Sequence, residues 1–181
     1  MTNQPITESG MTFGPYPDGH CFFIEKSRLY QCIQDHVQMV EFLLLKNNRD
    51  GEPNLWVVEA KSSSPRPDTR PNFEEFIVEI RDKLVNAVSL TIAAFLGRHG
   101  GENAEIPGPF QEVDLANVGV KLVLVINGHR NDWLPPLQEA VQDALRATIK
   151  TWSFGPNSVA VINDEGAKRH GLILNAEDDN A

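Results

Sequence analysis

The stretch LWVVEAK, residues 55–61, is the part of the sequence from which the fold is inferred. It is an uninterrupted apolar run with two opposite charges at its end. Four apolar residues without polar alternation are typical of a strand that is buried on both faces. Glu59 and Lys61 are two residues apart, so on a strand both side chains point to the same face of the sheet. Two interpretations stay open here. The pair is either a salt bridge where the strand reaches solvent, or the charged part of a metal-dependent hydrolytic site.

The segment before this stretch predicts its partner strand. Residues 37–45 (VQMVEFLLL) form a nonamer in which Glu41 is the single charge. A polar loop over residues 46–54, with Asp50-Gly51 in it, favours a hairpin. The two strands are therefore expected to pair antiparallel, which brings Glu41 near Glu59 and Lys61.

The rest of the chain predicts a sheet with helices packed on it. Short apolar runs and amphipathic segments predict strands over residues 21–24, 118–126 and 158–162 and helices over residues 72–99 and 133–152. The resulting order, strand–strand–strand–helix–strand–helix–strand, indicates an α/β (α+β) fold with a central mixed β-sheet flanked by helices.

Length and composition indicate one globular domain. The chain has 181 residues, of which 41% are hydrophobic and 23% charged, which is ordinary for a chain that buries a core. The expected organisation is an irregular N-terminal lead-in over residues 1–19, one domain over residues 20–174 and a frayed acidic tail over residues 175–181.

The net charge of the chain bears on which classes of function are compatible with the sequence. A formal net charge of −9 argues against a protein that coats nucleic acid by bulk electrostatics. It does not exclude a nuclease, because acidic clusters that hold divalent cations add negative charge.

No apolar run approaches the roughly 20 residues of a membrane span. The polar N-terminus and two cysteines without C-x-x-C spacing favour a cytoplasmic protein with reduced thiols, Cys21 and Cys32, in its core.

The chemistry of Glu41, Glu59 and Lys61 suits phosphodiester hydrolysis. That reaction requires charge neutralisation on the phosphate and a nucleophilic water, and a divalent metal serves both needs. Mg²⁺ prefers one or two carboxylates together with waters and phosphate oxygens, so Glu41 and Glu59 are candidate ligands. The backbone carbonyl of Ala60 is a further candidate ligand. Lys61 would position or help to deprotonate the water and offset charge on the phosphate.

These residues resemble a known family. An acidic residue on one strand, E-x-K closing the next strand, then a long helix and another strand are similar to the PD-(D/E)xK nuclease superfamily over residues 22–126. Glu41 matches the first acidic position, although Val40 stands before it where the family commonly has proline. Glu59-Ala60-Lys61 matches the second half of the motif. Glu25 matches a further acidic residue that many members carry in a preceding element.

The resemblance implies a restriction-endonuclease-like core and an Mg²⁺- or Mn²⁺-dependent endonuclease, acting on DNA rather than RNA. In that case Glu41, Glu59 and Lys61 are catalytic, and Glu41, Glu59 and Ala60 hold the metal. The alternative from another class is an inactive nuclease-like fold that serves as a binding or assembly subunit of a larger complex, with the charges structural. The partners expected are nucleic acid, and a protein partner or a second copy in a homodimer, but no membrane.

Other motifs add little. The five histidines show no zinc-ligand spacing, and no nucleotide-binding or serine-hydrolase signature occurs. His129-Arg130, at the end of a predicted strand, and Arg66, in the proline-rich segment over residues 62–71, either face a substrate or belong to ordinary solvated loops.

Overall fold

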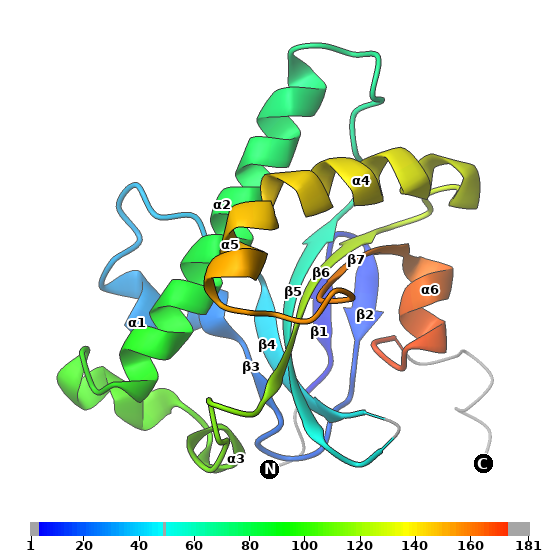
Figure 1. The fold of residues 1–181 in the computed structure, drawn as a ribbon. Coiled ribbons are helices and arrows are strands. Elements are labelled where there is room, and N and C mark those ends of the chain that lie inside the picture. The colour runs from blue at the N-terminus through cyan, green and yellow to red at the C-terminus, as the bar shows by residue number, and fades with distance from the viewer. Residues whose placement is uncertain (1–3, 49, 174–181) are drawn as a thin grey trace, which may run out of the picture.

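A computed structural model describes residues 4–48 and 50–173. Its centre is a five-stranded sheet with the strand order β3-β4-β5-β6-β7 (Figure 1). The strands are β3 (Cys21–Phe22), β4 (Phe42–Asn47), β5 (Pro53–Lys61), β6 (Gly119–Ile126) and β7 (Val159–Asn163).

The sheet is mixed, as expected from the sequence. β3, β4 and β5 pair antiparallel, whereas β6 and β7 run parallel to β5. In the β4–β5 hairpin Phe42 lies opposite Val58. Glu41 precedes the first residue of β4, and Val58, the partner of Phe42, precedes Glu59, so the two glutamates lie at the same end of the hairpin.

The longest helix, α2 (Asn72–Phe95), connects β5 to β6. Its apolar residues recur at three- and four-residue steps and are buried, among them Phe76, Ile80 and Leu84. Glu74 and Glu75 in the first turn favour the helix dipole. The helix ends before Gly97, which has the positive φ (72°) of a glycine after a helix C-terminus.

The two faces of the sheet have separate cores. On one face, alternate residues of β4, β5 and β6 pack against α2 and α4 (Leu134–Ala144). On the other face, Phe42, Val58 and Val123 pack against a second hairpin and the short helix α6 (Asp164–Arg169). Figure 1 shows α2 and α4 on one side of the sheet and the hairpin and α6 on the other. The central strands are therefore buried on both faces, which explains their unbroken apolar runs.

The second hairpin corrects the prediction for residues 1–19. Residues expected to be irregular form β1 (Ile6–Glu8) and β2 (Met11–Phe13), joined by a two-residue turn. Ser9 and Gly10 both have positive φ (53° and 76°), as in the tight turns of β-hairpins. The hairpin is tied to the C-terminal segment, because Phe13 forms a β-bridge with Ile173.

Other boundaries also differ from the predictions. The strand expected over residues 37–45 begins only at Phe42, so Glu41 precedes β4. The helix expected over residues 133–152 is divided at Leu145 into α4 and α5 (Arg146–Thr151). The expected loop after α2 contains a 3₁₀ helix, η2 (Gly100–Glu105), and α3 (Gly108–Gln111). The remaining short helices are η1 (Ile24–Lys26), α1 (Arg28–Gln31) and η3 (Asn131–Trp133).

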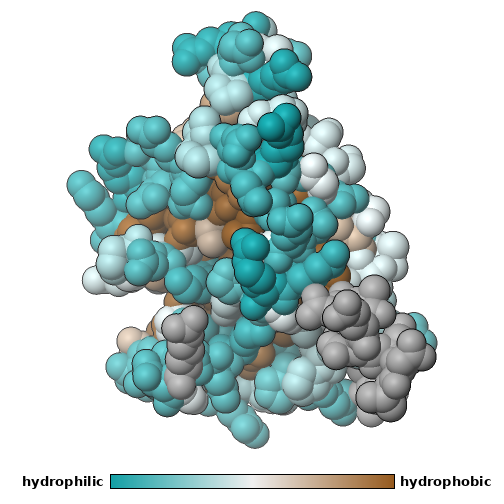
Figure 2. All heavy atoms as spheres, turned by 90° about the vertical axis from the view of Figure 1, so that its right-hand side faces the viewer, coloured by the Kyte–Doolittle hydropathy of each residue, from teal (hydrophilic) through white to brown (hydrophobic). Residues whose placement is uncertain are grey.

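The surface is mainly polar. Figure 2 shows a face covered by hydrophilic side chains, with apolar residues visible in recessed patches between them. Both cysteines are free thiols, but Cys32 is exposed and Cys21 half-buried, so the expectation that both belong to the core is wrong. Within the described residues, no helix combines the length and apolar character that a membrane span requires. The acidic tail over residues 175–181 lies outside the described residues.

Candidate functional site

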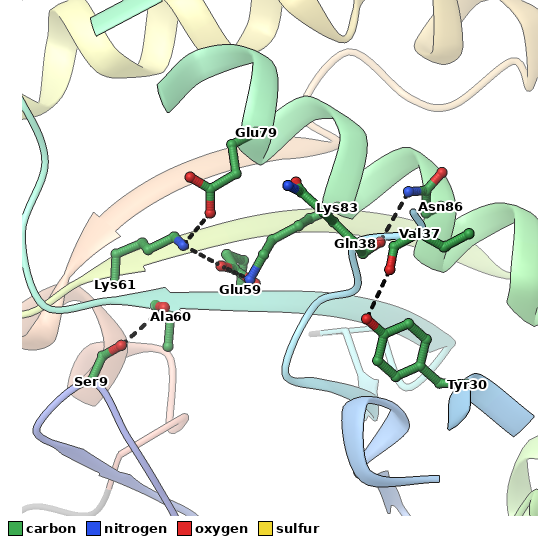
Figure 3. Close-up of polar contacts among 10 residues, drawn as sticks. All are labelled: Ser9, Tyr30, Val37, Gln38, Glu59, Ala60, Lys61, Glu79, Lys83 and Asn86. Atoms are coloured by element: carbon green, nitrogen blue, oxygen red, sulfur yellow. Dashed lines mark hydrogen bonds and ion pairs between the residues drawn. The ribbon is translucent and has the colours of Figure 1, made fainter. Parts of the chain in front are cut away.

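Glu59 is the centre of a buried charge network between the sheet and α2. Its side chain is 0% exposed, and its Oε1 atom lies 2.8 Å from Lys83 Nζ and 3.2 Å from Lys61 Nζ. Lys61 also donates a hydrogen bond of 2.5 Å to Glu79 Oε1. Figure 3 shows Glu79 and Lys83 reaching from α2 toward the end of β5. Two carboxylates and two ammonium groups therefore form a network that is formally neutral.

Glu79 and Lys83 were not predicted from the sequence. They are four residues apart and so lie on the same side of the helix, one turn from each other. The signal was present, because each immediately precedes a fully buried residue of the apolar stripe, Ile80 or Leu84. A charge at the border of such a stripe lies next to the sheet, but which strand residue it meets depends on how α2 crosses the sheet.

Glu41 lies in a second, acidic group. Ligand oxygens of Glu8, Glu25 and Glu41 all lie within 4.8 Å of one another. Lys26 lies beside this group, with its Nζ atom 3.5 Å from Glu8 Oε1, and its side chain is largely exposed. The structure thus brings together Glu41 and Glu25, both selected from the sequence. It adds Glu8 from the N-terminal hairpin, which sequence reasoning missed because that segment was expected to be irregular.

Two side-chain hydrogen bonds hold the segment that leads to Glu41. Tyr30 donates its hydroxyl hydrogen to the Val37 carbonyl (2.8 Å), and Asn86 of α2 donates to the Gln38 carbonyl (3.0 Å), as Figure 3 shows. The next two residues, Met39 and Val40, are buried. These contacts fix a segment that belongs to no strand, and Glu41 is only 6% exposed at its end.

The ionisation of Glu41 follows from this environment. Burial raises the pKa of the Glu41 carboxyl to about 8, and the nearby charges of Glu59, Glu25 and Glu8 act in the same direction. Proximity of like charges and loss of water both disfavour the carboxylate. Glu41 therefore holds a proton at neutral pH, and a cation bound beside it would favour release of that proton.

The pKa values of Glu59 and Lys61 are also shifted. Burial raises the pKa of the Glu59 carboxyl, although Lys83 and Lys61 act to lower it. Burial alone would lower the pKa of Lys61, but its hydrogen bond to Glu79 and the charges of Glu59 and Glu79 raise the pKa overall. Lys61 is therefore a persistent cation in this arrangement.

Each buried glutamate has an oxygen without a partner. Glu41 Oε2 and Glu59 Oε2 are buried and make no hydrogen bond within the described residues. An unpartnered buried carboxylate oxygen is costly, and it is the type of atom that Mg²⁺ or Mn²⁺ takes as a ligand. Together with Glu8 and Glu25, Glu41 thus offers oxygens that fit a divalent cation, whereas Glu59 is not part of this group.

The Ala60 carbonyl, the third predicted ligand, already has one partner. Ser9, in the hairpin turn, donates its hydroxyl hydrogen to this oxygen at 3.0 Å (Figure 3). A carbonyl oxygen has two lone pairs, so this contact leaves one acceptor position. The contact also fixes the hairpin that carries Glu8 against the end of β5.

Comparisons of this chain with models of protein families, with curated proteins and with solved structures gave no match.

Proposed function

We propose that this protein is a metal-dependent nuclease that hydrolyses phosphodiester bonds of nucleic acid, most simply as a DNA endonuclease of the PD-(D/E)xK type. The observation that carries the proposal is the neighbourhood of two buried glutamates, Glu41 and Glu59, each with an unpartnered carboxylate oxygen, beside the cationic Lys61. The sheet also supports the proposal. β4 and β5 are antiparallel and β6 and β7 run parallel to β5, and the superfamily motif occupies a mixed sheet of this kind.

The residues of the site would have different roles in the reaction. Glu41 and Glu59 Oε2 would hold Mg²⁺ or Mn²⁺, with Glu25 and Glu8 completing the acidic side and the Ala60 carbonyl as a further ligand. The bound cation supplies charge neutralisation at the phosphate and acidifies a water. Lys61, held by Glu59 and Glu79, would place its positive charge on the phosphate or orient the water. Its raised pKa supports the role of a cation over that of a general base.

Cleavage of DNA by matched variants tests this proposal. Plasmid and oligonucleotide substrates are incubated with Mg²⁺ or Mn²⁺ and the wild type, Glu59→Gln, Lys61→Met, or the controls Glu139→Gln and Lys150→Met. The control residues are exposed and lie on α4 and α5. We expect cleavage by the wild type and both controls and a loss of at least about 100-fold in the two site variants. A folded Lys61→Met variant that cleaves at the wild-type rate would refute the assignment.

A second candidate function is a nuclease-like subunit whose charges are structural. The observation that favours it is the saturation of Glu59 Oε1 by two lysines, one of which is also bound by Glu79. In that case the protein would act by binding a partner protein or a second copy. Titration calorimetry with Mn²⁺ separates the two functions, because a structural network predicts no heat of binding and the nuclease predicts a single site that is lost in Glu41→Gln.

A further inference from the structure

A cavity of about 490 Å³ begins where the charged site ends. It is enclosed by the segment that follows Lys61, residues 62–68, and by the segment that follows β6, residues 127–137. β5 and β6 are parallel neighbours, so both segments leave the same edge of the sheet. The carboxyl ends of parallel strands are the usual place for a ligand in such sheets, and the volume is in the range of small-molecule sites.

Two buried polar atoms in the cavity wall have no partner. Ser64 Oγ and His129 Nε2 make no hydrogen bond within the described part of the chain, and both residues line the cavity. Buried polar groups are normally satisfied, so these atoms indicate a polar ligand. Burial lowers the pKa of the His129 imidazole, and a neutral imidazole presents a hydrogen-bond donor on one ring nitrogen and an acceptor on the other.

Trp133 and Arg66 complete the lining of the cavity, and Arg130 lies next to the Trp133 ring. Trp133 is 41% exposed, and the guanidinium carbons of Arg66 and Arg130 lie 5.5 and 5.3 Å from its ring centroid. Arg130 is paired with Asp132 (3.1 Å), whereas Arg66 is exposed. A π-face beside an exposed cation is the combination with which proteins bind the bases and phosphates of single strands.

We infer that this cavity receives one unpaired nucleotide of the substrate strand, with its base against Trp133, its base edge near Ser64 and His129, and its phosphate near Arg66. A base stacked inside a duplex cannot enter such a recess without being extruded. The inference rests on the proposed nuclease function and deepens it. The substrate class is then nucleic acid with single-stranded or extruded nucleotides next to the phosphate held at Lys61.

Binding in the absence of metal tests the inference. A fluorescein-labelled twelve-nucleotide oligothymidine and a duplex of the same length are titrated with protein in EDTA, and anisotropy is measured. We expect the single strand to bind more tightly than the duplex and Trp133→Ala to weaken that binding by about 5- to 150-fold. The control Trp152→Ala removes another exposed tryptophan (45%) that does not line this cavity, and we expect it to bind as the wild type does.

Arg66→Met provides a second variant at an exposed position, where folding is not at risk. We expect weaker binding and a shallower dependence of log Kd on log salt, by about 0.7 if one phosphate contact is lost. Equal binding of duplex and single strand, no binding of either, or equal effects of Trp133→Ala and Trp152→Ala would each overturn the inference.

The outcome is separable from that of the nuclease proposal. If the oligonucleotide binds through Trp133 but no cleavage occurs with Mg²⁺ or Mn²⁺, the nuclease proposal fails and the cavity remains a nucleotide site. If cleavage requires Lys61 but Trp133→Ala neither weakens binding nor slows cleavage, the nuclease proposal stands and the cavity assignment fails.

Discussion

At the scale of single residues, the surroundings of Glu41 determine its charge state near neutral pH. Its neighbours include three carboxylates, and its pKa is raised to about 8. A carboxyl with a folded pKa above its unfolded value binds more protons in the folded state. Its stabilising contribution is therefore complete below about pH 4.5 and is lost as the pH rises through about 8.

This behaviour makes Glu41→Gln a stabilising substitution at alkaline pH. In EDTA at pH 8.5 we expect the free energy of unfolding to exceed that of the wild type by at least about 1.4 kcal/mol, the equivalent of one pKa unit. At pH 4.5 the difference should nearly vanish. Urea unfolding at several pH values measures it, with Glu139→Gln as the exposed control. A constant difference across this pH range would contradict the raised pKa.

Lys83 permits a second prediction, about how much the free energy of unfolding falls when Glu59 keeps only one lysine partner. Lys83→Met removes one of the two cations on a carboxylate that is 0% exposed. We expect the free energy of unfolding at pH 7 to fall by about 2 kcal/mol, the cost of losing a charged hydrogen bond at a buried group.

The matched control for Lys83 is Arg70→Met, which removes the exposed ion pair with Glu74 and should cost less than about 1 kcal/mol. Adding Glu59→Gln to Lys83→Met should recover part of the loss, because the uncompensated charge is then gone. If Lys83→Met and Arg70→Met cost the same, the network does not stabilise the fold.

At the scale of elements, the sequence predicted those helices and strands whose type is specified by the residue pattern within the segment itself. β5, β6 and α2 are long, regular and dominated by burial, so their type and approximate bounds follow from periodicity. The common face of Glu59 and Lys61, which both contact side chains of α2, follows from the period of two.

The elements that were missed depend on distant partners. β1 and β2 have three residues each and are stabilised by packing on the second face of the sheet and by the segment near Ile173. Residues 37–41 have a strand-like pattern, but side chains of Tyr30 and Asn86 hold them outside the sheet. Glu8 reaches the site only through such tertiary contacts. Glu79 and Lys83 border the apolar stripe of α2, but which strand residue they meet depends on how the helix crosses the sheet.

The N-terminal hairpin provides a prediction at this scale. A Cβ atom at Gly10 would lie 2.8 Å from Asn127 Nδ2, the group that donates a hydrogen bond to the Ser9 carbonyl. Gly51 has a similar φ (85°, against 76° at Gly10) but open space around it. Gly51→Ala should therefore cost only the backbone strain, about 1–2 kcal/mol.

Gly10→Ala should cost clearly more than Gly51→Ala, because the clash with Asn127 adds to the same strain. It should also increase amide hydrogen exchange in residues 6–13, which Gly51→Ala should not do. Thermal unfolding and hydrogen exchange measure the two effects. Equal losses in both variants would show that the turn is not held against Asn127.

At the scale of the whole molecule, binding of a cation at the acidic group should stabilise the entire fold. On the proposed function the folded protein would bind Mn²⁺ at Glu8, Glu25 and Glu41, whereas the unfolded chain lacks this arrangement. At a free concentration 100 times the Kd the expected gain is about 2.7 kcal/mol. For a chain of this size that corresponds to a rise in Tm of about 5–11 °C.

Differential scanning calorimetry with and without Mn²⁺ measures this rise. Glu25→Gln and Glu41→Gln should reduce it, and Glu139→Gln should leave it unchanged. The effect should be larger at pH 8.5 than at pH 6, because Glu41 must lose its proton to bind the metal. A Tm that does not respond to Mn²⁺ at either pH favours the structural interpretation of the charges.

The link between the N-terminal hairpin and the C-terminal segment also affects how the molecule is built during translation. Besides the Phe13–Ile173 bridge, Gly14 N–H and the Tyr16 hydroxyl both donate to the Leu172 carbonyl, at 3.0 and 2.9 Å. The Leu172 carbonyl leaves the ribosome more than 150 residues after the donors that it accepts from. Contacts so distant in sequence form late in folding. The contacts between the hairpin region and Leu172 therefore form only after the whole sheet, which lies between them in the sequence, has been synthesised.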